Sequence, residues 1–246
     1  PIWAARTIRR FTGIPILCVV ADGSPPKGAD HYVYLAWSSY QLAEAQPPKL
    51  HLDGGVPVIE DYESRVHDNQ DIDKTIFMYI GGLAEHGGIN ELASAFATLQ
   101  SRNIELWICG RGDNDQLQEL ANREDRIKLM GFLGDDELYE MAFRATFFVN
   151  PRPLGFDPNK LNFPSKLLLY LAFGKPVIST ISLGMSPEYS SVVIEIEDET
   201  EDALIRSLES AIQIDADVYN GYCEKVVDFK ELHTWDMQVS KFIDWL

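Results

Sequence analysis

The segment from residue 148 to residue 180 (FVNPRPLGFDPNKLNFPSKLLLYLAFGKPVIST) constrains the fold more than any other part of this sequence. An apolar run at 145–150 leads into it, a Pro-rich loop follows, then an apolar helical stretch at 167–173 and a second apolar run at 176–180. The two short runs are typical of buried strands. Because the helical stretch is apolar nearly all round, we expect a buried helix. The segment therefore predicts a strand, a crossover helix and a second, parallel strand.

Specific residues mark the ends of this helix. We predict that Asn162 caps it, that Pro164 lies in its first turn and that Gly174 follows its last residue. Free backbone amides at the helix start, together with Ser165 and Lys166, are a place where a phosphate group could bind. An ordinary crossover helix without a ligand explains the same residues, so the pattern alone leaves both interpretations open.

Strands and helices alternate regularly from residue 75 onward. Besides the central segment, strands are predicted at 75–80, 104–109, 126–130 and 192–196, and helices at 90–100, 115–122, 135–143, 201–214, 218–230 and 234–246. This alternation predicts an α/β fold with a Rossmann-like, doubly wound and mostly parallel sheet. Ligands of such sheets bind in a crevice at the carboxyl ends of the strands.

Glycine turns and a few cations are the candidate residues of that crevice. The turns are Gly81-Gly82, Gly110-Arg111-Gly112 and Gly131-Phe132-Leu133-Gly134, which directly follow predicted strands. The basic candidates are Lys166, Arg111, Arg152 and His86. The alternative for Arg152 is a structural role in which it bonds loop carbonyls, and for the other three it is a solvated surface position. Asp157 is interpreted as a turn residue, and Trp107 as part of the core.

The first 60 residues form a separate group of predicted elements. A helix at 2–11 and strands at 14–20, 31–37 and 50–52 precede an acidic segment at 60–73, which we interpret as a domain boundary. The chain starts at Pro1 rather than Met, so we expect a fragment or a processed product.

Composition excludes several classes of function. The formal net charge is −17 without a sustained basic cluster, which argues against binding to nucleic acid or to anionic membrane surfaces. No apolar run approaches the roughly 20 residues of a membrane span. Cys and His residues do not fall at metal-ligand spacing, so no metal site is predicted. The odd, dispersed cysteines indicate reduced cytosolic thiols, with Cys18 and Cys109 in the core.

Several motifs in order resemble a known family. These are YIGGLAEHGGINELASAF, LWICGRGD, IKLMGFLGDDELYEMAFRATFFVNPRP, NFPSKLLLYLAFGKPVIST and PEYSSVVIEIEDETEDAL, between residues 77 and 204. Together they resemble the C-terminal half of a family 4 (group 1) retaining glycosyltransferase of the bacterial polysaccharide or capsule type. The resemblance implies a GT-B architecture, in which two Rossmann-like domains face each other across a cleft.

The resemblance also implies a division of the chain. Residues 1–60 would be a remnant, the last strands, of the N-terminal acceptor-side domain, most of which is absent. Residues 61–232 would form the domain that binds the nucleotide sugar, and residues 233–246 a helix that returns to the N-terminal domain. The implied partners are a nucleoside-diphosphate sugar and a glycan or lipid-linked acceptor. The implied location is cytoplasmic, peripheral to the inner face of the membrane through the missing part.

Family roles transfer to matching positions of this sequence. Gly81 and Gly82 would form the turn beneath the donor diphosphate, and Gly131, Phe132 and Leu133 would lie beside the base. The phosphates would meet four residues at the central helix, Asn162, Phe163, Ser165 and Lys166, with Arg111 as a further donor-side cation. The resemblance assigns no catalytic residue and implies neither a cofactor nor a metal.

The sequence departs from the family at four positions. Gly82 and Gly87 stand where the family usually has Arg and Lys, the two cations that clamp the diphosphate. Leu161 and Leu169 stand where it commonly has two Glu residues. The second Glu usually contacts sugar or ribose hydroxyls, which Leu169 cannot do. Arg111, Arg152, Lys160 and Lys166 are the cations that could compensate in charge.

Three functions remain open on the sequence. The favoured one is the donor-binding half of a glycosyltransferase, with little transfer activity as an isolated fragment. A degenerate, non-catalytic relative that serves as a partner or scaffold subunit is the main alternative. A nucleotide-sugar epimerase of the same architecture would need catalytic groups in the absent half.

Overall fold

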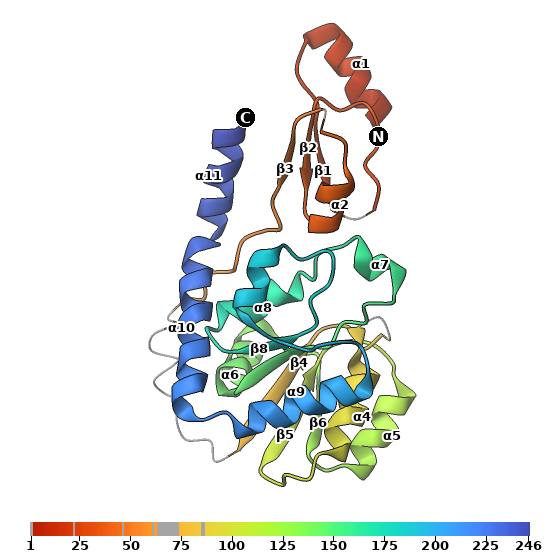
Figure 1. The fold of residues 1–246 in the computed structure, drawn as a ribbon. Coiled ribbons are helices and arrows are strands. Elements are labelled where there is room, and N and C mark those ends of the chain that lie inside the picture. The colour runs from red at the N-terminus through yellow and green to blue at the C-terminus, as the bar shows by residue number, and fades with distance from the viewer. Residues whose placement is uncertain (1, 22, 46, 61, 63–73, 85–86) are drawn as a thin grey trace.

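The computed structural model describes residues 2–21, 23–45, 47–60, 62, 74–84 and 87–246. Its larger part is a six-stranded, all-parallel sheet in the order β6-β5-β4-β7-β8-β9 (Figure 1). These strands are β4 (Thr75–Ile80), β5 (Ile104–Cys109), β6 (Ile127–Gly131), β7 (Phe147–Asn150), β8 (Val177–Ser179) and β9 (Val193–Glu195). Counted from β4, this is the strand order 3-2-1-4-5-6 of a doubly wound Rossmann-like sheet, as the alternation predicts.

Helices cover both faces of this sheet. One face packs on α4 (Ile89–Thr98), α5 (Asp115–Arg123) and α9 (Glu201–Gln213). The other packs on α6 (Asp135–Arg144), α8 (Lys166–Ala172) and α10 (Ala216–Leu232). Side chains alternate along each strand, so Phe77 and Tyr79 of β4 enter the first core, whereas Ile76 and Met78 enter the second. Both faces of the strands are therefore buried, which explains their continuous apolar runs.

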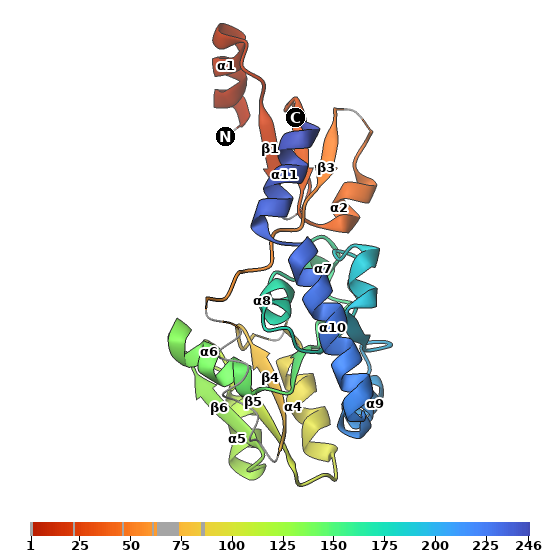
Figure 2. The same cartoon turned by 90° about the vertical axis from the view of Figure 1, so that its left-hand side faces the viewer.

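The N-terminal part has its own small sheet. Strands β1 (Leu17–Val20), β2 (His31–Tyr34) and β3 (Lys49–His51) pair in parallel, with α1 (Ile2–Thr12) and α2 (Trp37–Leu42) beside them. Figures 1 and 2 show this sheet set apart from the larger one, with α11 (Trp235–Trp245) running back beside it. The ring of Trp245 lies 5.5 Å from that of His31, and the Val56 N–H donates to the His233 carbonyl at 2.7 Å. The last helix therefore contacts the N-terminal part.

Some predicted elements are wrong in extent. The strand predicted at 31–37 ends at Tyr34, and Trp37 instead begins α2. Two other short helical segments, α7 (Asp157–Lys160) and the 3-10 helix η2 (Pro187–Ser191), were also not predicted. Segments of four to six residues are too short to show a full helical repeat of apolar residues. Most of the acidic segment at 60–73 lies outside the described residues.

The buried positions largely follow the sequence. Trp107 and Cys109 are in the core, as predicted, whereas Cys18 is only half-buried against the small N-terminal cluster. In the described part of the chain, no helix is long and apolar enough to cross a bilayer.

Candidate functional site

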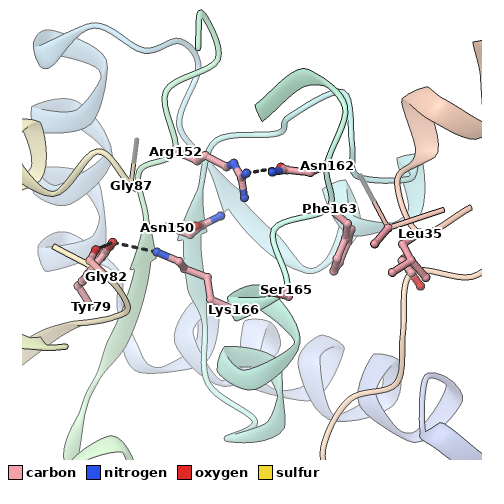
Figure 3. Close-up of a pocket in the computed structure, with 12 residues that line it drawn as sticks. Leu35, Tyr79, Gly82, Gly87, Asn150, Arg152, Asn162, Phe163, Ser165 and Lys166 are labelled. Carbon is pink, nitrogen blue, oxygen red and sulfur yellow. Dashed lines mark hydrogen bonds between the residues drawn. The ribbon is translucent and has the colours of Figure 1, made fainter. Parts of the chain in front are cut away.

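A cavity of about 410 Å³ opens at the carboxyl ends of β4 and β7 (Figure 3). In sequence order the strands proceed outward from β4 to β6 on one side and from β7 to β9 on the other, so the winding direction reverses between β4 and β7. This switch point is where doubly wound sheets place their ligands. The lining residues are Ala21, Leu35, Asp53, Tyr79, Gly82, Gly87, Asn150, Arg152, Asn162, Phe163, Ser165 and Lys166.

The glycine turns after β4, β5 and β6 are joined to one another by backbone hydrogen bonds. The Gly81 N–H donates to the Cys109 carbonyl at 2.9 Å, and the Gly110 N–H donates to the Gly131 carbonyl at 2.8 Å. A Cβ atom at Gly110 would lie 1.7 Å from the Gly81 oxygen, so a side chain there would push the first turn away. The three glycine turns therefore lie side by side at the carboxyl ends of β4, β5 and β6, and the reason for glycine at position 110 is close backbone approach.

Lys166 brings a cation to the first turn. Its Nζ donates to the Tyr79 hydroxyl at 2.9 Å and lies 4.2 Å from the centre of the Tyr79 ring. Tyr79 in turn donates to the Gly82 carbonyl at 2.8 Å. A Cβ atom on Gly81 would lie 2.7 Å from the Lys166 Nζ, so the ammonium group lies directly over this turn. Tyr79 therefore holds Lys166 at the place where the predicted diphosphate turn begins.

Burial makes the charged form of Lys166 energetically unfavourable when no anion is bound beside it. Desolvation, and then the nearby Arg152 guanidinium, lower the pKa of Lys166 from 10.5 to about 8. Desolvation also raises the pKa of Tyr79 to about 12. The Tyr79 hydroxyl therefore stays neutral while it accepts the hydrogen bond from the Lys166 ammonium group. Among the described residues no carboxylate forms an ion pair with Lys166. A bound anion would favour the charged form of Lys166 and so offset the cost of its desolvation.

Arg152 is the second cation of the cavity. Its guanidinium donates to the Asn162 side-chain oxygen, and its backbone oxygen accepts a hydrogen bond from the Thr180 hydroxyl at 2.8 Å. Asn150, at the end of β7, donates to the Ser179 hydroxyl at 2.9 Å. The loop after β7 is thus fixed to the end of β8. In Figure 3 the Arg152 side chain extends toward Asn162 and the Lys166 side chain toward Tyr79, with Asn150 between them.

The predicted start of the central helix is wrong. Its first helical residue is Lys166, and Ser165 is at the N-cap position without a side-chain cap. Asn162 does not cap the helix because its side-chain oxygen accepts from Arg152 instead. Pro164 precedes the first turn, and its carbonyl accepts from the Leu167 N–H at 2.8 Å.

The expected free amides at this helix start are also partly used. The N–H groups of Ser165 and Leu168 donate to the carbonyls of Phe163 and Ser165 at 2.9 and 3.2 Å. The cation Lys166, rather than a row of free amides, is the main group that this helix offers an anion. The other predicted end is confirmed, since Gly174 follows the helix with φ of 65°.

The predicted donor-side residues divide into two groups. Gly82, Asn162, Phe163, Ser165 and Lys166 line the cavity, and Gly81 lies against Lys166. Arg111 instead places its guanidinium 3.5 Å from the centre of the Phe132 ring, at the carboxyl ends of β5 and β6. Phe132 is 63% exposed, and Gly131 and Leu133 flank it.

The remaining basic candidates lie elsewhere. Lys160 pairs with Asp157 at 2.8 Å on the surface of α7, so Asp157 begins a short helix rather than lying in a turn. His86 lies outside the described residues.

Sequence reasoning missed three residues of the cavity. Tyr79 was interpreted only as part of a strand, Asn150 only as the end of one, and Asp53 only as part of a loop. Each is a polar residue at or just after the carboxyl end of a predicted strand, which is the signal that could have found them.

Asp53 brings a carboxylate from the N-terminal part. It follows β3, next to the ends of β1 and β2 that contribute Ala21 and Leu35. It is 7% exposed, and burial raises the pKa of its carboxyl. In the described part of the chain, no cluster of three or more His, Cys, Asp or Glu side chains is arranged to hold a metal ion.

Comparison with known families gives one match. The family model described as glycosyl transferases group 1 matches residues 74–213 of this chain, a range that includes both cations of the cavity. No curated protein sequence matches the chain significantly.

Solved structures give a fold-level match over nearly the whole chain. A glycosyltransferase from Rickettsia africae ESF-5 has a TM-score of 0.77 at 14% identity, covering 99% of this chain and 73% of its own. The Anabaena protein HepE, solved in complex with UDP and glucose, has a TM-score of 0.70 at 12% identity and covers 97% and 73%. Sucrose-phosphate synthase from Thermosynechococcus elongatus has a TM-score of 0.69 at 16% identity and covers 89% and 58%. These neighbours share the GT-B fold.

Proposed function

Because the chain belongs to the group 1 glycosyl transferases, whose family model matches residues 74–213, we propose that it is the donor-binding half of a sugar-transferring enzyme. The donor is a nucleoside-diphosphate sugar, and the acceptor is a glycan or a lipid-linked acceptor. In this proposal the diphosphate occupies the cavity at the switch point of the large sheet.

The observation that carries the proposal is the pair of cations in that cavity. Lys166 lies over the Gly81-Gly82 turn, held by Tyr79, and Arg152 lines the same cavity from the loop after β7. The family usually clamps the diphosphate with cations at the positions of Gly82 and Gly87. Here a Cβ atom at Gly87 would lie 2.4 Å from the Tyr79 hydroxyl, so the tyrosine occupies the space that a side chain there would need. Lys166 and Arg152 thus replace the family's clamp.

The chemistry of sugar transfer explains why cations are needed. As the bond between the sugar and the diphosphate breaks, negative charge builds up on the diphosphate oxygens. Fixed cations in a partly desolvated site stabilise that charge more effectively than mobile water does. Lys166 and Arg152 are fixed by hydrogen bonds to Tyr79 and Asn162 before any ligand arrives. We expect these two side chains to act on the leaving group without a metal ion or a cofactor.

The nucleoside and the acceptor are assigned to opposite sides of the cavity. The base lies toward Gly131, Phe132 and Leu133, where the Arg111 guanidinium stacks on the Phe132 ring. The acceptor lies toward the N-terminal part of the chain, which carries β1, β2 and β3. A polysaccharide-type acceptor fits a cytoplasmic enzyme that works at the inner face of a membrane. The Anabaena neighbour, described with UDP and glucose, supports a nucleotide sugar as the donor.

A degenerate scaffold subunit is the competing function. Leu161 and Leu169 in place of two glutamates, and glycine at two clamp positions, favour it. A scaffold has no need to keep nucleotide affinity, so nucleotide binding separates the two functions.

Calorimetric titration with UDP and with GDP tests the proposal. We expect one of the two to bind the wild-type protein, and Lys166→Ala to bind it at least tenfold more weakly, about 1.4 kcal/mol. Lys160→Ala is the matched control, because it removes a positive charge that pairs with Asp157 and does not line the cavity. Folded wild-type protein that binds neither nucleotide would favour the scaffold. Equal losses in both variants would assign the effect to net charge.

A further inference from the structure

Asp53 is the single carboxylate among the described residues that line the cavity. It lies on the N-terminal wall, because it follows β3 and the preceding Leu52 N–H donates to the Tyr34 carbonyl at 3.0 Å, beside Leu35. In Figure 3, Leu35 lies across the cavity from Tyr79 and Lys166, with Phe163 between them. The acid and the cations therefore enter the cavity from different sides.

The Asp53 carboxyl is only partly satisfied for a buried acid. The Tyr189 hydroxyl, the His51 ring and the Glu188 carboxylate are its neighbours, and the hydroxyl and the ring favour its charged form. Within the described residues, however, the Asp53 Oδ2 atom has no partner at hydrogen-bonding geometry, and Asp53 forms no ion pair. A buried carboxylate without compensating bonds destabilises the fold. Residues of this kind in a cleft are candidates for ligand binding.

A second polar group of the same cavity is also incompletely used. Asn150 is 1% exposed, and its side-chain nitrogen donates to Ser179, but its Oδ1 atom has no partner among the described residues. Asn150 and Asp53 follow strands of different sheets, yet both line the cavity that also contains Lys166 and Tyr79. Two unsatisfied oxygen acceptors in one cavity fit a ligand that is rich in hydroxyl donors.

Both positions where the family commonly has Glu are apolar here, including Leu169, where the family's Glu usually contacts sugar or ribose hydroxyls. Leu169 packs against the large core, and the Leu161 backbone oxygen accepts a hydrogen bond from the Ser39 hydroxyl at 3.4 Å. Neither leucine side chain can accept a hydrogen bond. If the chain binds a sugar, the carboxylate that recognises it must come from another element.

We propose that Asp53 recognises the sugar of the donor, its carboxylate accepting hydrogen bonds from sugar hydroxyls while Asn150 contributes its amide from the opposite sheet. This assignment rests on the proposed function, since it needs the diphosphate to be held by Lys166 and Arg152. It places the transferred sugar between the two sheets, next to the acceptor side. It also gives the N-terminal part a direct role in donor selection.

The test compares nucleotide with nucleotide sugar. Titration calorimetry is run with UDP, UDP-glucose and UDP-galactose, or with GDP and GDP-mannose if GDP is the nucleotide that binds. The variants are Asp53→Ala and Asp53→Asn, with Asp136→Ala as the control, because Asp136 is an exposed carboxylate on α6. We expect Asp53→Ala to bind the free nucleotide within twofold of wild type, and at least one nucleotide sugar tenfold or more weakly. The Asn variant keeps one acceptor oxygen and should lie between the two.

The unchanged affinity for free nucleotide also shows that the variant is folded. If Asp53→Ala weakens nucleotide and nucleotide sugar by the same factor, Asp53 is structural and the inference is wrong. If nucleotide-sugar affinity does not change, the inference is also wrong, while the proposed function stands. If the wild-type protein binds no nucleotide, the proposed function fails first and the inference falls with it.

Discussion

Replacing Lys166 with methionine is expected to stabilise the free protein and to weaken its nucleotide binding. Met has nearly the same length and volume as the lysine stem but carries no charge. The substitution removes a desolvated ammonium group that no described carboxylate pairs with, and it leaves the bond from the Tyr79 hydroxyl to the Gly82 carbonyl in place. A residue kept at a cost to stability is typical of a functional site.

The size of the stabilisation follows from the pKa. A fall in the pKa of Lys166 from 10.5 to about 8, caused mainly by desolvation, corresponds to a penalty on the order of 3 kcal/mol for the charged form. The lost hydrogen bond to Tyr79 offsets about 1 kcal/mol of this. A net gain of roughly 2 kcal/mol raises the Tm of a domain of this size by about 4–8 °C.

The pH dependence has a definite sign. Between pH 8 and 10.5 the unfolded chain holds the Lys166 proton more tightly than the folded chain does, so the penalty is complete below pH 8 and fades as the pH rises. Thermal unfolding of wild type and Lys166→Met is therefore compared at pH 7 and at pH 10. We expect the gain at pH 7 to shrink at pH 10. A variant that is less stable than wild type at pH 7, or a gain that does not change with pH, would refute the reasoning.

Three further predictions concern the cation pair and the core. Tyr79→Phe removes the group that holds Lys166 and should weaken nucleotide binding about three- to tenfold, from the roughly 1 kcal/mol value of one hydrogen bond; unchanged affinity in calorimetry would rule out the positioning role. Nucleotide affinity of the wild type should fall as the pH rises above about 8, the pKa to which burial lowers Lys166. Nucleotide binding in this pH range should take up protons, which calorimetry in buffers of different ionisation enthalpy can measure. A nucleotide affinity that stays constant up to about pH 9.5 would contradict this prediction. Arg126→Leu leaves the Glu124 carboxylate and the Leu99 and Ser101 carbonyls without their partner. Urea unfolding should therefore show a free energy of unfolding that is lower by about 3 kcal/mol, with unchanged nucleotide affinity. A decrease of less than about 1 kcal/mol would be inconsistent with a buried Arg126–Glu124 pair.

The sheet was predictable because its signals are local. The strands are short apolar runs, three of which (β4, β5 and β6) lead into glycine turns, and the covering helices show local caps or a helical spacing of apolar residues. Thr200, Asp215 and Thr234, for example, cap the last three helices with their side chains. The parallel direction of the strands followed from the helices that connect one strand to the next.

The interior of the site was less predictable because its contacts join distant residues. Tyr79 and Lys166 are 87 positions apart, and no local pattern indicates that one holds the other. Asn162 has the composition of a helix cap, yet Arg152, ten positions earlier, competes successfully for its oxygen. Asp53 carried only the general signal of a polar residue just after a predicted strand, because its burial depends on the approach of two separate sheets.

The central claim is that the cavity between β4 and β7 binds the donor diphosphate. The most direct test is a crystal structure of the protein with the nucleoside diphosphate that binds in calorimetry. We expect phosphate oxygens within hydrogen-bonding distance of the Lys166 Nζ and the Arg152 guanidinium, above the Gly81-Gly82 turn. A nucleotide bound outside this cavity, or in it with its phosphates away from both cations, would contradict the account.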